Sequence, residues 1–258
     1  TDSVRGVTAI MSSDSTNPES VFNATWISNY GQLTSFNTNG FSVQSGSVAN
    51  SNYNNSGNNY VGWQWQAGQG TTSSNTNGSI TSTVSVNTTA GFSIVTYTGN
   101  GTTSTVGHGL GVAPSMIIFK NRGSAQDWWV YHASVGVNAY LVLDSTAAQT
   151  ANNGWTGTSS TTFTVGGSGA QYNANGNTYV AYCFAQIAGF SKFGSYTGNG
   201  STDGPFVYLG FRPKYVMVKR TDVASSWWVY DSVRNTYNLS TQILAPNVTD
   251  AEYSTGYF

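Results

Sequence analysis

Charge is scarce in this sequence. Only 7% of its 258 residues are Asp, Glu, Lys or Arg, and the formal net charge is −1, whereas roughly 25% of an ordinary globular chain is charged. The 9 Lys and Arg residues form no block. Proteins that bind nucleic acid neutralise phosphates with clustered cationic side chains. The sequence therefore predicts no nucleic-acid partner.

Cysteine and long apolar runs are also nearly missing. Cys183 is the single cysteine, which excludes an internal disulfide, and its apolar surroundings predict a buried structural thiol. No run approaches the roughly 18 apolar residues of a membrane helix, and no signal peptide precedes Thr1. We expect no membrane insertion. An exported protein without disulfides or signal is typical of a virion, so a virion or extracellular location is expected.

Aromatic residues, by contrast, are plentiful. The chain has 8 Trp, 16 Tyr and 12 Phe, and Ser, Thr, Asn and 30 Gly fill much of the remainder. So many large apolar rings are enough to fill sizeable cores, which argues against disorder. Hydroxyl and amide groups must then provide most of the polar surface, as is typical of shell or fibre proteins.

One long stretch of the sequence occurs twice. Tyr-Thr-Gly-Asn-Gly stands at 97–101 and at 196–200, and Trp-Trp-Val-Tyr stands at 128–131 and at 227–230. The offset is constant, since 196 − 97 = 227 − 128 = 99. A repeat of this length exceeds a solenoid rung or a propeller blade and has the size of a small β domain.

The repeat is out of phase with the chain. Residues 2–6 match 231–235, and residues 59–67 match a segment that begins at 177 or 178 and ends at 185. We therefore divide the chain as follows: 1–69, the later part of a unit; 70–91, a Ser/Thr/Asn/Gly-rich linker or hairpin; 92–189, a complete unit; 190–258, the first part of a further unit.

Two interpretations of this phase remain open. Either the sequence is a window on a longer array, or the units are permuted and share strands. In both cases the two end segments hold complementary strands, and exposed sheet edges invite pairing. We expect these segments to pack together, within one chain or head to tail between chains.

Short β-rich runs bounded by turn residues fill the sequence. They lie at 115–120, 128–131, 138–143, 161–165, 178–187, 192–196 and 214–219. The Asn-Gly pairs at 100–101 and 199–200 indicate tight turns, because both residues tolerate positive φ. Many short strands with regular turns predict an all-β chain of tandem antiparallel β-sandwich or jelly-roll-like domains.

Four strings carry a family resemblance: residues 106–114, 128–131, 179–184 and 193–200. They resemble a recurring module of tailed-bacteriophage virion proteins, tail-fibre-like and often marine. The resemblance covers essentially the whole chain. It implies a viral structural protein or adhesin, and it brings no known catalytic or binding residues with it.

Residues suited to catalysis are few. Asp127, His132 and Ser134 can be written as a triad, but they lie on or beside one strand and would point to different faces. Asp127 and Asp144 could supply the two carboxylates of a glycosidase, although nothing in their spacing requires it. Clustered metal ligands and calcium loops are missing from the sequence. The sequence predicts no enzyme, no metal and no cofactor.

The paired tryptophans are the candidate contact residues. Successive residues of a strand point to opposite faces, so one tryptophan of each pair is expected in the core. The other is a candidate assembly or glycan contact; the four residues are Trp128, Trp129, Trp227 and Trp228. Trp63 and Trp65 share one face, which is typical of core positions.

Lys120 and Lys219 end equivalent strands. We expect each to be solvated, or to pair with Asp127 and Asp222 respectively across the following turn.

Three functions are compatible with these observations. The first is a non-enzymatic virion structural protein, part of a fibre, spike or shell appendage. It would assemble as a homo-oligomer and contact other virion proteins. The second is an adhesin that binds a host-surface glycan on the same scaffold. The third, a polysaccharide depolymerase, is disfavoured by the scarcity of acid and base residues.

Overall fold

The computed structural model describes residues 31–47, 53–68, 72–151, 154–236, 240–248 and 250–254. Within these ranges every regular element is a β-strand, and every paired set of strands is antiparallel. The predicted all-β, antiparallel class is confirmed. In the match of residues 2–6 to 231–235, residues 2–6 lie outside the described residues.

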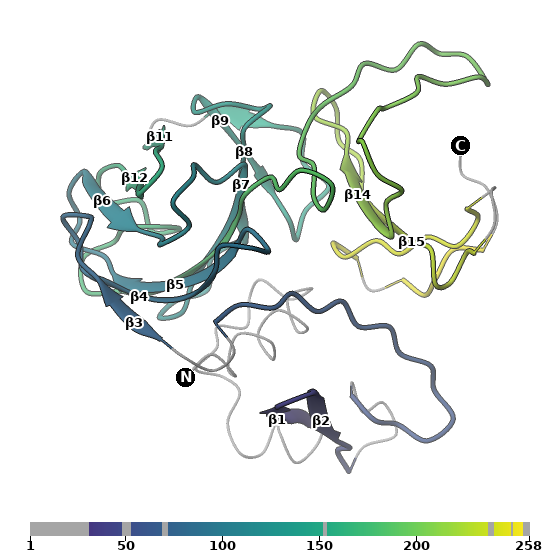
Figure 1. Ribbon diagram of the computed structural model, residues 1–258, viewed down its shortest axis with the longest axis horizontal. Coiled ribbons are helices and arrows are strands. Elements are labelled where there is room, and N and C mark those ends of the chain that lie inside the picture. Colours follow the sequence, from purple (N-terminus) through teal and green to yellow (C-terminus); the bar gives the residue numbers. More distant parts are fainter. Residues whose placement is uncertain are drawn as a thin grey trace.

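The largest part is a sandwich-like pair of sheets (Figure 1). One sheet has eight strands in the order β10-β9-β8-β7-β13-β5-β4-β3. Their bounds are β3 Ser73–Asn75, β4 Ser82–Asn87, β5 Phe92–Thr98, β7 Met116–Asn121, β8 Trp129–His132, β9 Ala139–Val142, β10 Thr150–Ala151 and β13 Thr178–Phe184. The facing sheet has the order β11-β12-β6, with β6 Ser104–Gly107, β11 Trp155–Thr158 and β12 Thr162–Val165.

The core lies between the two sheets and follows the two-residue period of strands. On β13 the alternate residues Tyr179, Ala181 and Cys183 are fully buried in it. Phe163 and Val165 reach the same cluster from β12. Fully burying a side chain of this size contributes about 1.5–3 kcal/mol. The central position of β13 explains its long apolar run, since its other face is largely covered as well.

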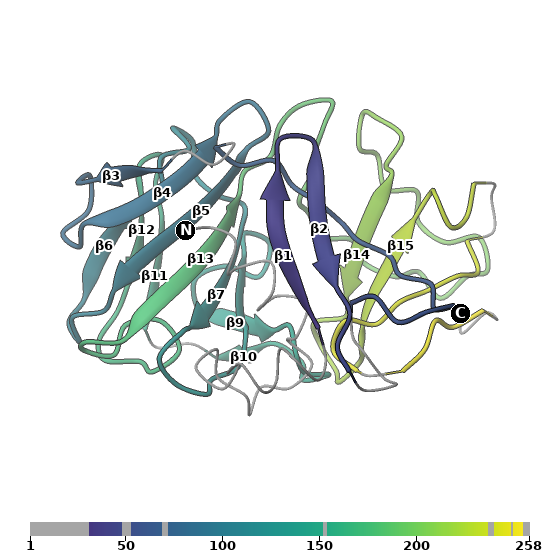
Figure 2. The same cartoon turned by 90° about the horizontal axis from the view of Figure 1, so that it is seen from below.

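Two smaller lobes accompany the sandwich (Figures 1 and 2). The C-lobe comprises residues 190–236, 240–248 and 250–254, and contains the hairpin of β14 (Tyr215–Lys219) and β15 (Trp227–Asp231). The N-lobe comprises residues 31–47 and 53–68, with the hairpin of β1 (Gln32–Asn37) and β2 (Gly40–Gln44). Figure 1 shows β14–β15 beside the sandwich and β1–β2 below it.

The segment 70–91, where the structure describes it, supplies two strands of the large sheet. β4 pairs with β5, and β3 forms the outer edge. Ser82 Oγ donates a 2.7 Å hydrogen bond to the Gly107 carbonyl, which joins β4 to the facing sheet. A stretch of small polar residues thus pairs with the sandwich at its edge.

Candidate functional site

Trp128 and Trp129 lie on opposite sides of their strand. Trp128 is 2% exposed, and its ring stacks against Tyr182 at 6.2 Å and 21°. Trp129 is half-buried and stacks on Tyr140 with an interplanar angle of 11°. Both indole rings are therefore engaged by rings of the same sandwich.

Trp227 and Trp228 divide in the same way. Trp227 is 4% exposed, and its indole Nε1 donates a 2.8 Å hydrogen bond to the Val142 carbonyl at the end of β9. The same ring belongs to a buried cluster with side chains of the sandwich, namely Met116, Val130 and Leu141. Trp228 is half-buried and meets Tyr253 edge-on at 5.8 Å. The first tryptophan of the second pair therefore joins the C-lobe to the sandwich.

Lys120 is not solvated, and this expectation was wrong. The residue is only 2% exposed. Its Nζ donates to the Gln126 carbonyl and lies 5.4 Å from the Trp128 ring centroid. Burial lowers the pKa of Lys120, and the charges of Asp144 and Asp127 oppose that shift. Lys219, in contrast, lies in a more open position and donates to the backbone carbonyl of Arg220.

Asp144 supports the backbone of the first tryptophan pair. Its Oδ1 accepts a 3.0 Å hydrogen bond from the Trp128 backbone N–H, while Oδ2 is buried without a hydrogen-bond partner among the described residues. Burial raises the pKa of Asp144, although the hydrogen bond from Trp128 acts in the opposite direction. An orphaned carboxyl oxygen is costly when ionised, which agrees with the direction of this pKa shift.

Both histidine rings accept hydrogen bonds from backbone N–H groups. His108 is fully buried, with Nδ1 accepting from the Leu110 N–H at 3.1 Å and Nε2 3.2 Å from the Ser159 carbonyl. His132 Nδ1 accepts from the Ser134 backbone N–H at 3.2 Å. Burial lowers the pKa of both rings. Because that hydrogen bond occupies His132 Nδ1, Asp127 does not orient this ring as in a catalytic triad.

Buried asparagines, which the sequence analysis did not single out, hold the loops of the sandwich. Asn173 is fully buried. Its Nδ2 donates to the carbonyls of Thr102 (2.6 Å) and Gly167 (2.8 Å), and its Oδ1 accepts from the Asn100 N–H (3.1 Å). The Asn-Gly turn at 100–101 is thereby fixed in the core. The signal available in the sequence was the Asn-rich run at 173–177.

The two tryptophan hairpins pair in the same register. Ile118 faces Val130 across β7 and β8, and Met217 faces Val229 across β14 and β15. Both pairs are related by the 99-residue offset, since 217 − 118 = 229 − 130 = 99. Local side-chain pairing is thus the same in the sandwich and in the C-lobe.

The correspondence extends beyond the matched strings. Leu141 pairs with Val130, and Leu244 forms a bridge with Val229. Asn247 Oδ1 accepts a 2.8 Å hydrogen bond from the Trp227 N–H, as Asp144 does from Trp128. Here the offset is 103 residues, because 244 − 141 = 247 − 144 = 103. The additional four residues hide this match from a comparison at constant spacing.

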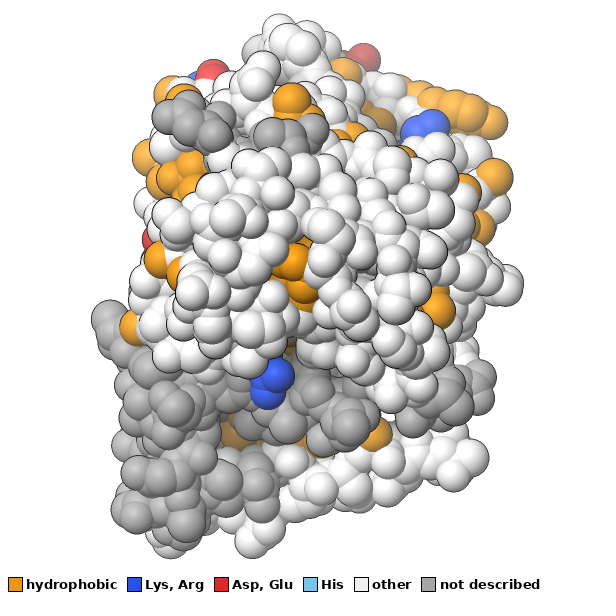
Figure 3. All heavy atoms as spheres, turned by 90° about the vertical axis from the view of Figure 1, so that its left-hand side faces the viewer, with side chains coloured by type: hydrophobic (Ala, Val, Ile, Leu, Met, Phe, Trp, Pro, Cys, Tyr) orange, Lys and Arg blue, Asp and Glu red, His pale blue; other side chains and the backbone are white. Residues whose placement is uncertain are grey.

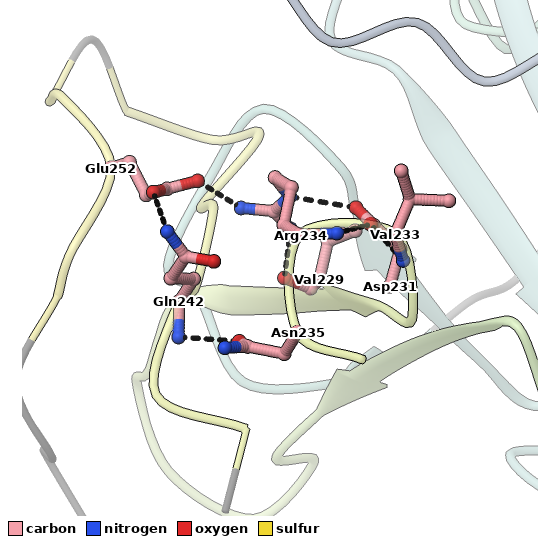
Figure 4. Close-up of polar contacts among 7 residues, drawn as sticks. All are labelled: Val229, Asp231, Val233, Arg234, Asn235, Gln242 and Glu252. Carbon is pink, nitrogen blue, oxygen red and sulfur yellow. Dashed lines mark hydrogen bonds and ion pairs between the residues drawn. The ribbon is translucent and has the colours of Figure 1, made fainter. Parts of the chain in front are cut away.

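Arg234 fixes the last described segment of the C-lobe (Figure 4). Its guanidinium donates to Asp231 at 2.7 Å and to Glu252 at 2.5 Å. Burial acts to raise the pKa of Asp231, but the hydrogen bonds from Arg234 outweigh it and hold that pKa below its usual value. Glu252 also accepts from Gln242 Nε2 at 3.0 Å. This partly buried network joins three separate stretches of chain.

The surface is mostly uncharged. In the face that Figure 3 shows, neutral polar atoms dominate, hydrophobic side chains form small groups, and charged side chains are isolated. Among the described residues no three His, Cys, Asp or Glu side chains are grouped to hold a metal ion. The same part of the chain contains no helix long and apolar enough to cross a membrane.

Residues 1–257 match a family described as a domain of unknown function, DUF7483. The chain belongs to this family. No curated protein and no solved structure matches the chain significantly.

Proposed function

We propose that this DUF7483 chain is a non-enzymatic structural element of a virion, in which copies of one β-sandwich module are joined rigidly in series. The observation that carries the proposal is the burial of Trp227 against the neighbouring sandwich. The resemblance of residues 106–114, 128–131, 179–184 and 193–200 to tailed-phage virion modules agrees with it.

The module is the 99-residue unit of the sequence. The shared register of the β7–β8 and β14–β15 hairpins supports this assignment. A second observation supports it further. Asp144 and Asn247 accept equivalent hydrogen bonds from the backbone N–H of the first tryptophan of each pair.

A rigid junction between units suits a structural element that must keep its shape under force. Domains within one chain move relative to each other unless their interface is large and hydrophobic. Here one indole ring is buried among side chains of the preceding unit, and its only polar atom is satisfied by the Val142 carbonyl. Rotation of the C-lobe would expose that ring and break that hydrogen bond.

We further propose that copies of the chain associate through the C-lobe. Tyr208 is 76% exposed and Val233 is 84% exposed. At the 99-residue offset the sandwich has Gly109 and Ser134 in these places. Exposed large apolar side chains in one unit, where the other has small residues, favour a contact made only by this unit.

Sedimentation of the intact chain, with Tyr208→Ser and Val233→Ser as variants, tests the association. We expect the native chain to form oligomers and the double variant to be monomeric. A monomeric native chain at tens of micromolar, together with specific binding on a glycan array that Trp129→Ala or Trp228→Ala abolishes, would instead favour the adhesin.

A further inference from the structure

The segment 53–65 of the N-lobe has the local structure of residues 172–184. Tyr60 Oη accepts a 2.9 Å hydrogen bond from the Asn55 N–H, and Tyr179 Oη accepts one of 2.8 Å from the Ala174 N–H. The preceding turns match too: Gly57 has φ +80° and Gly176 has φ +79°. All these pairs share one offset, since 179 − 60 = 176 − 57 = 119.

The N-lobe hairpin matches a second element of the sandwich. Leu33 pairs with Val43 and Phe36 with Phe41, with a bulge after Leu33. In the sandwich, residues 155 and 165 pair, as do 158 and 163, with a bulge after residue 155. The offset is again constant, because 155 − 33 = 165 − 43 = 122. The N-lobe therefore contains counterparts of β11, β12 and β13.

In the sandwich these elements have fixed neighbours. β13 lies between β5 and β7, and β12 pairs with β6. Tyr179 on β13 faces Tyr97 on β5, and their rings stack at 5.2 Å. Tyr97 is consequently only 5% exposed.

The C-lobe contains the counterparts of β5 and β6 without such neighbours. Residues 192–214 form no strand, although the Asn-Gly turn within them keeps its local shape. Ser201 N–H donates to Asn199 Oδ1 at 3.0 Å, as Thr102 N–H does to Asn100 Oδ1. Tyr196, the counterpart of Tyr97, is 55% exposed. Among its described residues, the C-lobe lacks the equivalent of β13 as a neighbour for its counterpart of β5, and the equivalent of β12 as a neighbour for its counterpart of β6.

The same chain already brings the equivalent of β13 to the C-lobe at one end. Phe184 faces Met116 across β13 and β7. Their counterparts are Trp65 and Tyr215, whose rings lie 5.6 Å apart and perpendicular. Trp65 also contacts Phe184 at 5.8 Å, and Gly68 N–H donates to Ser85 Oγ at 3.0 Å, which anchors the segment beside the sandwich.

The middle of the segment is still exposed to solvent. Tyr60 is 50% exposed, and Val61 is 43% exposed. Trp63 Nε1 is buried without a hydrogen-bond partner among the described residues, which is rare in a completed fold. On the facing hairpin, Phe41 is 45% exposed. Tyr60, Val61 and Phe41 occupy positions at which the sandwich has buried residues, namely Tyr179, Val180 and Phe163.

We propose that residues 59–66 insert, within the same chain, between residues 191–197 and β14, and so complete a second sandwich from the N-lobe and the C-lobe. In this closed form Tyr60 faces Tyr196, Val61 faces Ser195, and β2 pairs with residues 203–206. Closure within one chain is favoured over exchange between copies because Trp65 already contacts Tyr215, so the two partners are held at high effective concentration. The inference rests on the module assignment made for the proposed function.

Disulfide trapping in the intact chain tests the register. Facing residues of antiparallel strands have Cα atoms about 4.5–5.5 Å apart, within disulfide range. Val61→Cys with Ser195→Cys should form an intramolecular bond, and Val180→Cys with Thr96→Cys, which face each other across β13 and β5, should do so in the sandwich as a positive control. Val61→Cys with Thr197→Cys is the matched out-of-register control, and should react at least about tenfold more slowly, since diagonal positions lie about 7–8 Å apart.

Three outcomes decide the matter. Faster intramolecular bonding of the 61/195 pair, together with amide-exchange protection of residues 193–197 in the unmodified chain, supports closure. Covalent dimers that appear in place of the internal bond overturn it in favour of exchange between copies. Equal rates for 61/195 and 61/197, or unprotected amides at 193–197, also overturn it. Sedimentation of the Tyr208 and Val233 variants is independent of all three results, so the proposed function can fail or stand separately.

Discussion

The indole Nε1 of Trp227 donates a hydrogen bond to the carbonyl of Val142, which lies 85 residues earlier in the chain. One side chain of β15 thus satisfies the carbonyl of the last residue of β9 in the neighbouring sandwich. The junction between the two units is a buried ring with a satisfied polar atom, and its strength can be measured.

Trp227→Phe should weaken the junction. The ring stays apolar, but the Val142 carbonyl loses its donor, which costs about 1–3 kcal/mol for a buried acceptor. We expect a lower free energy of unfolding in urea and faster amide exchange in β14 and β15. Trp228→Phe is the matched control and should change both much less. Equal effects from the two variants would contradict the role given to Trp227.

Asp144→Asn should alter the pH dependence of stability. Burial raises the pKa of Asp144 above its ordinary 3.8 in the folded protein. The folded state therefore binds this proton more tightly than the unfolded chain, and the contribution is complete below about pH 4 and is lost as pH rises through the raised pKa. Asparagine keeps the acceptor for Trp128, as Asn247 does for Trp227.

The measurement is the difference in unfolding free energy between Asp144→Asn and the native chain from pH 4 to pH 7. It should shift in favour of the variant as the pH rises. A difference that is constant with pH would show that Asp144 titrates alike in both states.

Asn173→Ala should be among the most damaging single changes in the sandwich. It leaves the carbonyls of Thr102 and Gly167 and the N–H of Asn100 without their partner. Each buried unsatisfied group costs about 1–3 kcal/mol. Asn175→Ala, at an exposed position of the same loop, should be nearly neutral. Thermal unfolding followed by circular dichroism would compare them, and similar melting temperatures would refute the prediction.

Arg234→Met should release the segment 250–254 from the C-lobe. The change removes the guanidinium that joins Asp231 to Glu252 while keeping the apolar stem. Faster amide exchange at Tyr253 is the expected result. Arg220→Met removes an ion pair to Asp222 that is exposed to solvent, and it should have no measurable effect, because exposed pairs contribute little.

Self-association should resist salt. With 7% charged residues and a net charge of −1, contacts between copies must depend on aromatic packing and neutral hydrogen bonds. Attractions between exposed charges are screened within about 8 Å at physiological ionic strength. Sedimentation in about 1 M NaCl should therefore show the same oligomer as at low salt. Dissociation at high salt would point to ion pairing instead.

Local features of this fold could be predicted from the sequence, because neighbouring residues determine them. The hairpin strands, the Asn-Gly turns and the all-β class depend on short-range pattern and on positive φ, as at Gly101 with φ +74°. The burial of Lys120 could not be predicted, since it depends on how Trp128 and Gln126 fold over the strand end.

Long-range contacts could not be predicted from the sequence patterns, for a related reason. The bond from Trp227 to Val142 joins two units whose relative placement no local period specifies. The equivalence of Asp144 and Asn247 was hidden by four additional residues in the preceding loop, and only the shared hydrogen bond to a tryptophan N–H reveals it. Strands at 192–196 were predicted from apolar pattern, yet a strand also needs a neighbour to pair with.

The complete burial of Cys183 on β13 has a consequence for the environments that this fold tolerates. Its thiol is shielded from oxidants, and burial raises its pKa, so the reactive thiolate is disfavoured. Within these 258 residues no covalent link forms or breaks with redox conditions. Reducing and oxidising surroundings therefore leave this chain with the same set of internal covalent bonds.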